Sequence, residues 1–166
     1  MAATSSFDIT STIDFQEVDN ALNQARKEVV QRYDFKGSKA NIELNPTEKK
    51  LTLTADDESK MNALWEIVQT RLVRRGVAVK NFKVGESEPA AGGTLRRVID
   101  IQQGIPIEAA REIVKFLKDK KLKKVQAAIQ ADQVRVSAPA KDELQEAMRH
   151  LREHDFGVSL QFGNYR

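Results

Sequence analysis

Hydrophobic positions alternate with polar ones in some segments of the chain and recur every three or four residues in others. Residues 6–14 alternate, which is typical of a β-strand. Residues 15–33 carry an apolar stripe with helical spacing, and Asp14 followed by Glu17 predicts a capping box at the start of this helix. Two strands joined by a turn at 45–48, a helix over 57–75 and a strand over 77–84 follow.

The same order of elements returns in the second half of the chain. A strand over 94–103 is followed by a helix up to residue 121, a hairpin of residues 123–130 and 133–138, a helix over 141–154 and a last strand over 158–162. The stretch LTLTADDESKMNALWEIV aligns with VRVSAPAKDELQEAMRHL without a gap. An internal repeat of about 75 residues is therefore expected.

The order βαββαβ, present twice, is that of a ferredoxin-like sandwich, in which two helices cover one face of a four-stranded antiparallel sheet. The sequence therefore predicts an α+β fold with two such sandwiches from an internal duplication. We place the first at residues 1–84 and the second at 94–166, with the Pro- and Gly-rich stretch 85–93 as a linker. Each unit is small and marginally stable by itself, so we expect the halves to pack together or exchange an edge strand.

Composition narrows the class of protein. The 166 residues are 40% hydrophobic and 31% charged, a profile typical of globular proteins. No apolar run approaches the roughly 20 residues of a membrane span, and the first residues, MAATSSFD, lack the basic and apolar regions of a signal peptide. A cytoplasmic protein is therefore expected. The absence of cysteine excludes disulfides, thiolate catalysis and cysteine-based metal sites.

The positive charge of the chain lies in its second half. Residues 91–166 carry 14 Lys and Arg against 10 Asp and Glu, and six of the lysines lie between Lys115 and Lys124. Such a cluster attracts anionic partners. The alternative is structural, because cations at the C-terminal end of a helix interact favourably with its dipole, by about 0.3–1 kcal/mol each.

The two expected hairpins define which side chains face away from the helices. In the first hairpin Ile42 opposite Leu53 and Leu44 opposite Leu51 face the core, which leaves polar residues on the open face. The open face of the second sheet carries Gln126 with Ser137, Ala128 with Arg135, and around them Lys124, Gln130, Ser159 and Gln161.

This second open face is basic and rich in amides, which suits hydrogen bonds to phosphates, riboses or base edges. It lacks the aromatic platform on which RNA-recognition modules of this topology stack bases, so RNA is expected to bind through its backbone or elsewhere. The alternative is that the sheet simply keeps one solvated face. The expected phosphate contacts are Lys120, Lys121, Lys123, Lys124, Gln126 and Arg135, with Arg96 and Arg97 as second candidates.

The sequence favours binding without catalysis. It contains no GxxxxGK[ST] loop, no GxGxxG after a strand and no spacing that indicates a nucleophilic triad. His150 and His154 have the spacing that can share a metal, but no third ligand is evident, and an exposed helix face is expected instead. Gly104 before a helix start offers only a weak anion site. We expect neither a cofactor nor a metal.

Three stretches together, SFDITSTIDFQEVDNALNQARKEVVQRYDFKGS, QGIPIEAAREIVKFLKDKKLKKVQAAIQADQVRVSAPAKDELQEAM and QFGNYR, resemble the YajQ family of small bacterial proteins. The resemblance covers essentially the whole chain, and KLKKVQAAIQADQVRVS with the DELQ after it is its most specific part. The sequence departs from the family where a basic pair usually precedes this motif. Ala138 and Pro139 stand there, and only Lys141 is basic.

The resemblance implies two ferredoxin-like domains whose N-terminal strands are exchanged, so that residues 6–14 join the second sheet and residues 94–102 the first. It also implies a nucleotide-binding protein with a regulatory role, whose ligand is ATP, GTP, a cyclic dinucleotide or RNA such as tRNA. The alternative hypothesis is a protein-interaction or self-association module whose open sheets dock a protein partner. The apolar side chains on both faces of residues 95–101 favour this alternative.

Overall fold

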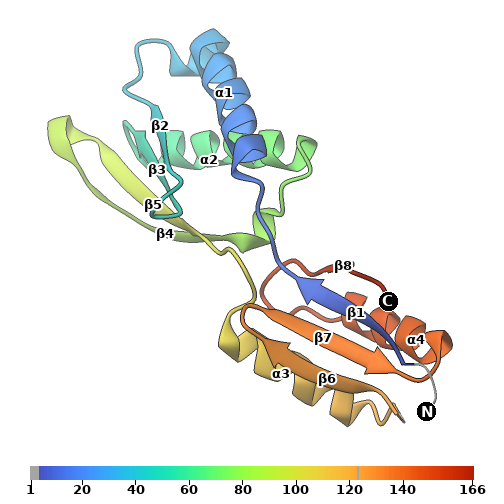
Figure 1. Ribbon diagram of the computed structural model, residues 1–166. Coiled ribbons are helices and arrows are strands. Elements are labelled where there is room, and N and C mark those ends of the chain that lie inside the picture. The colour runs from blue at the N-terminus through green and yellow to red at the C-terminus, as the bar shows by residue number, and fades with distance from the viewer. Residues whose placement is uncertain (1–3, 123) are drawn as a thin grey trace. The chain divides into compact units, whose positions relative to one another are not determined.

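The computed structural model of the chain describes residues 4–122 and 124–166, which form two compact units (Figure 1). The first unit consists of Ile13–Gln102, and the second consists of the residues up to Thr12 together with Gln103–Arg166. Each unit has one four-stranded antiparallel sheet and two α-helices. The expected α+β architecture of two ferredoxin-like units is confirmed. In the part of the chain that the structure describes, no helix is long and apolar enough to cross a membrane.

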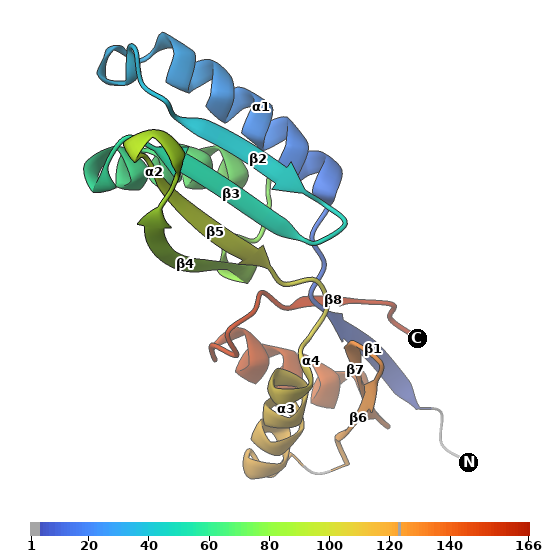
Figure 2. The same cartoon turned by 90° about the vertical axis from the view of Figure 1, so that its left-hand side faces the viewer.

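The sheet of the first unit has the strand order β2-β3-β5-β4, and α1 and α2 cover one of its faces (Figure 2). Leu51, Leu53 and Ile99 of the sheet and Leu64 of α2 are completely buried between these layers. The elements are α1 (Phe15–Gln31), β2 (Asn41–Asn45), β3 (Lys50–Ala55), α2 (Glu58–Arg74), β4 (Phe82–Pro89) and β5 (Leu95–Ile101).

Helix α1 begins and ends for local reasons. The Asp14 carboxylate accepts hydrogen bonds from the backbone N–H groups of Gln16 and Glu17, at 3.0 and 3.3 Å. The Glu17 side chain accepts a hydrogen bond from Asn20 instead of completing the expected capping box. The helix ends at Gln31, so Tyr33 lies outside the apolar stripe to which we assigned it and is 89% exposed. That assignment was wrong because the chain leaves the helix two residues earlier than the spacing suggested.

The sheet of the second unit has the order β6-β7-β1-β8, with α3 and α4 packed on one face. Phe7 and Ile9 of β1 and Val134 and Val136 of β7 are completely buried in its core. The elements are β1 (Ser5–Thr10), α3 (Ile107–Asp119), β6 (Gln126–Gln130), β7 (Gln133–Ala138), α4 (Lys141–Arg152) and β8 (Gln161–Gly163).

The opening strand of each repeat lies in the sheet built mainly by the other repeat. Strand β1 pairs with β7 on one side and with β8 on the other. Strand β5 pairs with β3 and β4 in the same way. Both sheets therefore contain strands from both halves of the sequence. That this arrangement arose by exchange between duplicated halves stays a prediction.

The stretch 85–93, which we expected as a linker, lies within the first sheet. Strand β4 continues to Pro89, and the turn Ala91–Gly93 leads directly back into β5. A register shift between Val84 and Ser87 marks an irregularity in β4. A Cβ atom at Gly85 would lie 2.8 Å from the Val98 carbonyl oxygen, so glycine allows the close approach of the two strands here. The glycines that suggested a linker thus serve a bulged hairpin.

The register that we expected for both hairpins is confirmed. In the first, Ile42 pairs with Leu53 and Leu44 with Leu51. In the second, Gln126 pairs with Ser137 and Ala128 with Arg135. Ile129 is opposite Val134 as expected, but it is 37% exposed because β6 is the edge strand.

The strand pairing predicts which sheet a core substitution weakens. Ile9→Ala in β1 should destabilise the second unit, and Ile99→Ala in β5 the first, by about 2–5 kcal/mol each, because each leaves a cavity in a fully packed core. Amide hydrogen exchange should therefore quicken in β7 and β8 for Ile9→Ala, and in β3 and β4 for Ile99→Ala. Faster exchange in β2 and β3 for Ile9→Ala would contradict this pairing.

Candidate functional site

The open face of the second sheet is held by an ion pair between its two central strands. Asp8 of β1 is directly opposite Arg135 of β7. The Arg135 Nε donates to Asp8 Oδ1 at 2.9 Å, and Nη2 is 3.4 Å from Oδ2. Because the two residues are 127 positions apart in the sequence, this contact depends on β1 lying in the second sheet.

Asn164 adds a third contact to Asp8. Its Nδ2 donates a hydrogen bond to Asp8 Oδ2 at 2.6 Å, and the Asp8 residue is only 6% exposed. The hydrogen bonds from Arg135 and Asn164 lower the pKa of Asp8 from its ordinary value, and they outweigh the opposing effect of burial. Asp8, Arg135 and Asn164, the Asp8 network, therefore join β7 and β1 to the segment after β8.

The Asp8 network changes the interpretation of Arg135. Its side chain is 33% exposed, and two of its nitrogens already contact the Asp8 carboxylate. Arg135 is thus a cross-strand partner, and a phosphate would have to share it with Asp8. Gln126 is exposed at the far edge of the same face.

The lysines expected to contact phosphate lie around the turn between α3 and β6. Lys120 caps α3, and its ammonium lies 5.0 Å from the centroid of the Phe116 ring. Lys121 and Lys124 have positive φ angles of 53° and 67°, which are turn conformations. We expected a strand from Lys123 onwards, but β6 begins at Gln126, so Lys124 precedes the sheet face to which we assigned it.

Two further expected residues lie outside this region or cannot be placed. Lys123 lies outside the described residues. Arg96 is exposed in the first unit and lies 3.6 Å from Glu88. None of these positions tests a phosphate contact, which stays a prediction for each lysine and for Arg96.

Arg97 lies on the opposite side of its strand from Arg96. Its side chain is 10% exposed, and Nη2 is 2.9 Å from Glu58 Oε1 and 3.1 Å from Ser87 Oγ. The register explains this burial, because Arg97 is opposite Leu53, a core residue of the helix-covered face. In this position Arg97 serves the packing of the first unit and is the weakest of the candidates for contact with a phosphate.

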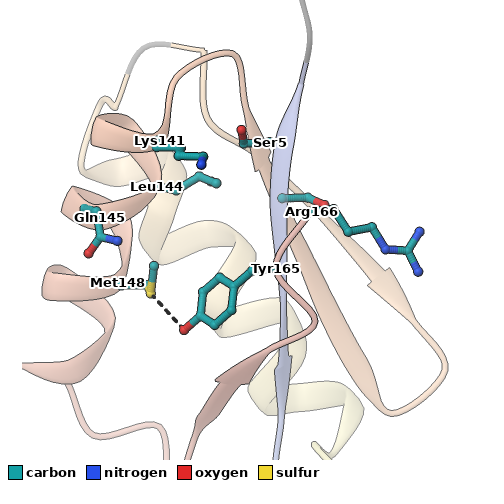
Figure 3. Close-up of a pocket in the computed structure, with 8 residues that line it drawn as sticks. Ser5, Lys141, Leu144, Gln145, Met148, Tyr165 and Arg166 are labelled. Atoms are coloured by element: carbon teal, nitrogen blue, oxygen red, sulfur yellow. Dashed lines mark hydrogen bonds between the residues drawn. The ribbon is translucent and has the colours of Figure 1, made fainter.

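A cleft of about 350 Å³ lies in the second unit between the start of β1, α4 and the residues after β8 (Figure 3). Its sides come from segments far apart in the sequence that the sheet brings together. Lining residues are Ser5, Ser6, Lys141, Leu144, Gln145, Met148, Tyr165 and Arg166. The volume is in the range of small-molecule sites, which are mostly apolar with a few polar groups.

The short last strand explains the cleft. Strand β8 ends at Gly163, and Asn164 has a left-handed φ of 52°, a conformation that asparagine tolerates. Arg166 then pairs with Ser6 through two backbone hydrogen bonds of 3.0 and 3.1 Å. Its side chain points away from the cleft, whereas the Tyr165 ring points towards Met148 (Figure 3). The Asp8 network fixes Asn164 and thereby the position of Tyr165.

The cleft combines one aromatic ring with groups that bind anions and polar edges. Tyr165 is 61% exposed, and its hydroxyl lies 3.8 Å from Met148 Sδ. Lys141 and Gln145 contribute an ammonium and an amide from the first turns of α4, and Ser5 and Ser6 contribute hydroxyls. Helix α4 has no side-chain hydrogen bond at its N-cap, Ala140. A flat ring beside a cation is suited to a ligand with an aromatic base and a negative charge.

The two histidines belong to a surface cluster. His154 Nε2 lies 3.3 Å from Glu112 Oε1, and its ring packs between Phe116 and Phe156 at centroid distances of 4.7 and 4.5 Å. His150 lies 3.8 Å from Glu146. Among residues 4–122 and 124–166 there is no group of three or more His, Asp or Glu side chains that could hold a metal ion.

Sequence reasoning missed Asp8 and the cleft. The alternation of residues 6–14 already placed Asp8 on the open face, and the implied strand exchange would have set it against Arg135. The cleft had a different signal, because DELQ belongs to the most specific part of the family resemblance and the closing QFGNYR is one of the three stretches that carry it. What the sequence lacked was the proximity of these stretches to Ser5 and Ser6.

The Asp8 network predicts a pH-dependent contribution to stability. Asp8→Asn should lower the free energy of unfolding at pH 7 by about 2 kcal/mol, because Arg135 loses a charged acceptor. The folded-state pKa of Asp8 is lowered, so its contribution is present above the unfolded pKa of about 3.9 and is lost as pH falls through the folded pKa. Wild type and variant should therefore converge in acid. Urea unfolding followed by circular dichroism measures this, and Asp19→Asn, at an exposed position in α1, is the control.

Comparison with known proteins agrees with this architecture. The family described as "Nucleotide-binding protein YajQ-like" matches residues 5–166. A protein of Carboxydothermus hydrogenoformans named "Nucleotide-binding protein" is 48% identical over 166 residues, the whole of both chains. A protein of Solibacter usitatus with the same name is 52% identical over 161 residues, which are 97% of this chain and 96% of that one. The chain belongs to the YajQ-like family.

Proposed function

We propose that this protein binds a nucleotide without transforming it, and that the base occupies the cleft beside Tyr165. The names of the bacterial relatives support the ligand class. The observation that carries the location is the exposed Tyr165 ring facing a cleft that also contains the Lys141 ammonium. Any of the nucleic-acid bases can stack on an aromatic side chain, because every base has a π-face.

The phosphates would extend from the cleft towards the basic turn of residues 120–124. Ser5 pairs with Ala138 and Gln126 pairs with Ser137, so the cleft and the basic turn belong to the same end of the second sheet. Lys141 is the cation nearest the base, and Lys120, Lys121 and Lys124 supply further positive charge at this end. Charge-assisted hydrogen bonds to phosphate are about twice as strong as neutral ones.

The size of the cleft favours one base at a time. A volume of about 350 Å³ is at the lower end of ligand sites, which range from about 300 to 1,000 Å³. Each of the expected ligands would place a single base in the cleft, whether it is ATP, GTP, one half of a cyclic dinucleotide or an unpaired base of an RNA such as tRNA. No pair of acidic and basic side chains lines the cleft among the described residues, which supports binding without catalysis. We also propose that the protein has a regulatory role, which it would exert through ligand binding of this kind.

Removing the ring should weaken nucleotide binding. Tyr165→Ala is expected to raise the Kd for ATP or GTP about 5- to 150-fold, which corresponds to the 1–3 kcal/mol of base–aromatic stacking. Isothermal titration calorimetry measures the change. Tyr33→Ala, which removes an even more exposed tyrosine from the first unit, should leave the Kd unchanged.

The same titration separates the cleft from the open sheet face. Gln126→Ala removes an exposed amide from that face and should leave the Kd unchanged, whereas Lys141→Ala should raise it. If Gln126→Ala weakens binding and Tyr165→Ala does not, the open face is the site and the cleft is not.

Salt dependence distinguishes a polynucleotide from a mononucleotide. If the ligand is RNA, log K should fall linearly with log salt, and replacement of Lys124 by Ala should reduce the slope by about 1, because one phosphate contact and its released counterion are lost. Fluorescence anisotropy with a labelled single-stranded RNA at several salt concentrations measures the slope. A binding constant that does not change with salt, or a slope that Lys124→Ala leaves unchanged, would contradict phosphate binding by this turn.

A further inference from the structure

Strand β6 is an edge strand without a charged residue. Its sequence is Gln126-Ala127-Ala128-Ile129-Gln130, and all its partners lie on one side, in β7. Natural proteins usually protect such an edge with lysine, proline or a bulge, because its free N–H and C=O groups can pair with another strand. None of these devices occurs in β6, and its Ile129 is 37% exposed.

The hairpin geometry shows which backbone groups are free. Gln130 pairs with Gln133 across a two-residue turn, so this closing pair exchanges hydrogen bonds, and so do the alternate pairs Ala128–Arg135 and Gln126–Ser137. The N–H and C=O groups of the remaining two residues, Ala127 and Ile129, therefore point away from β7. Any antiparallel strand added to this edge must bond to these two residues.

We propose that β6 pairs with β6 of a second copy of this chain across a two-fold axis at Ala128. In this register every residue of β6 is opposite a residue of the other β6, which no other register achieves. Ala127 faces Ile129 of the second copy as a hydrogen-bonded pair, and Gln126 faces Gln130. Apolar groups thus meet apolar groups and amides meet amides, and Ala128 meets itself in a pair without hydrogen bonds.

Charge complementarity supports the same register. Two residues beyond the pair of Gln126 and Gln130, Lys124 of one copy approaches Asp132 of the other, and the symmetry repeats this contact at the opposite end. Both residues are exposed, and neither makes an ion pair in the part of the chain that the structure describes. The two sheets would join into one continuous eight-stranded sheet. The residues that line the nucleotide cleft do not belong to β6, so the base site and this interface are separate. Lys124 would take part both in this interface and in the proposed phosphate contacts.

The absence of cysteine makes a direct test possible. Under mild oxidation, the full-length Ala128→Cys variant should form at least about fivefold more disulfide-linked dimer than Gln126→Cys or Gln130→Cys alone, because only residue 128 faces itself at disulfide distance. A mixture of Gln126→Cys and Gln130→Cys should restore cross-linking. All three positions are exposed, and circular dichroism checks that each variant is folded.

Sedimentation of the unmodified protein provides a second readout. The average mass should rise with protein concentration, and Ile129→Lys should abolish the rise by placing a charge next to the two-fold axis of the interface. Equal cross-linking at the three cysteine positions, or a mass that stays monomeric at the highest concentration reached, would overturn the proposal. Either of these two outcomes would leave the expected results of the nucleotide titrations unchanged.

Discussion

The second unit depends on the pairing of β1 with two strands from the other end of the chain. Strand β8 pairs only with β1, and the hairpin of β6 and β7 by itself would be a two-stranded ribbon of marginal stability. Insertion of β1 joins these parts into one sheet and adds Phe7 and Ile9 to the core. The pairing closes a loop of more than a hundred residues, whose entropy cost must be offset by this burial. The first unit needs no such long closure, because it is continuous from Ile13 to Gln102 and β4 turns directly into β5.

Asp8 connects this constraint to the candidate site. A buried carboxylate is costly unless it is hydrogen-bonded and paired, and Arg135 and Asn164 together provide both. Asn164 then holds the residue after it, Tyr165, over the gap that the short β8 leaves beside α4. An ion pair on an open sheet face thus supports the geometry of a cleft on the other side of the sheet.

The fold was largely predictable from sequence, and the candidate site was not. Alternation and helical spacing gave the order of elements and both hairpin registers, because these signals are local and repeat twice. The stretch 85–93 was misinterpreted because glycine marks both linkers and bulged hairpins, and only the contact of Gly85 with Val98 distinguishes them. The surroundings of Arg97 and Arg135 were not predicted. Arg97 faces the core and Arg135 faces the Asp8 carboxylate, and both environments depend on the pairing with a neighbouring strand. The cleft joins three separate segments, and no local pattern reports such proximity.

The lysine cluster shows why charge alone is a poor guide to a site. Lys118 lies in the last turn of α3 and Lys120 caps it, where positive charge offsets the helix dipole and where Lys120 also lies over Phe116. These roles account for Lys118 and Lys120 without any ligand. Tyr165 differs, because its ring lies near Phe7 and Met148 yet stays 61% exposed, at the edge of a cleft that Lys141 also lines. If a base stacks on Tyr165 as we propose, the ring and the nearby cations would give affinity for nucleotides in general. Gln145 and the serine hydroxyls would then select among them at the base edge.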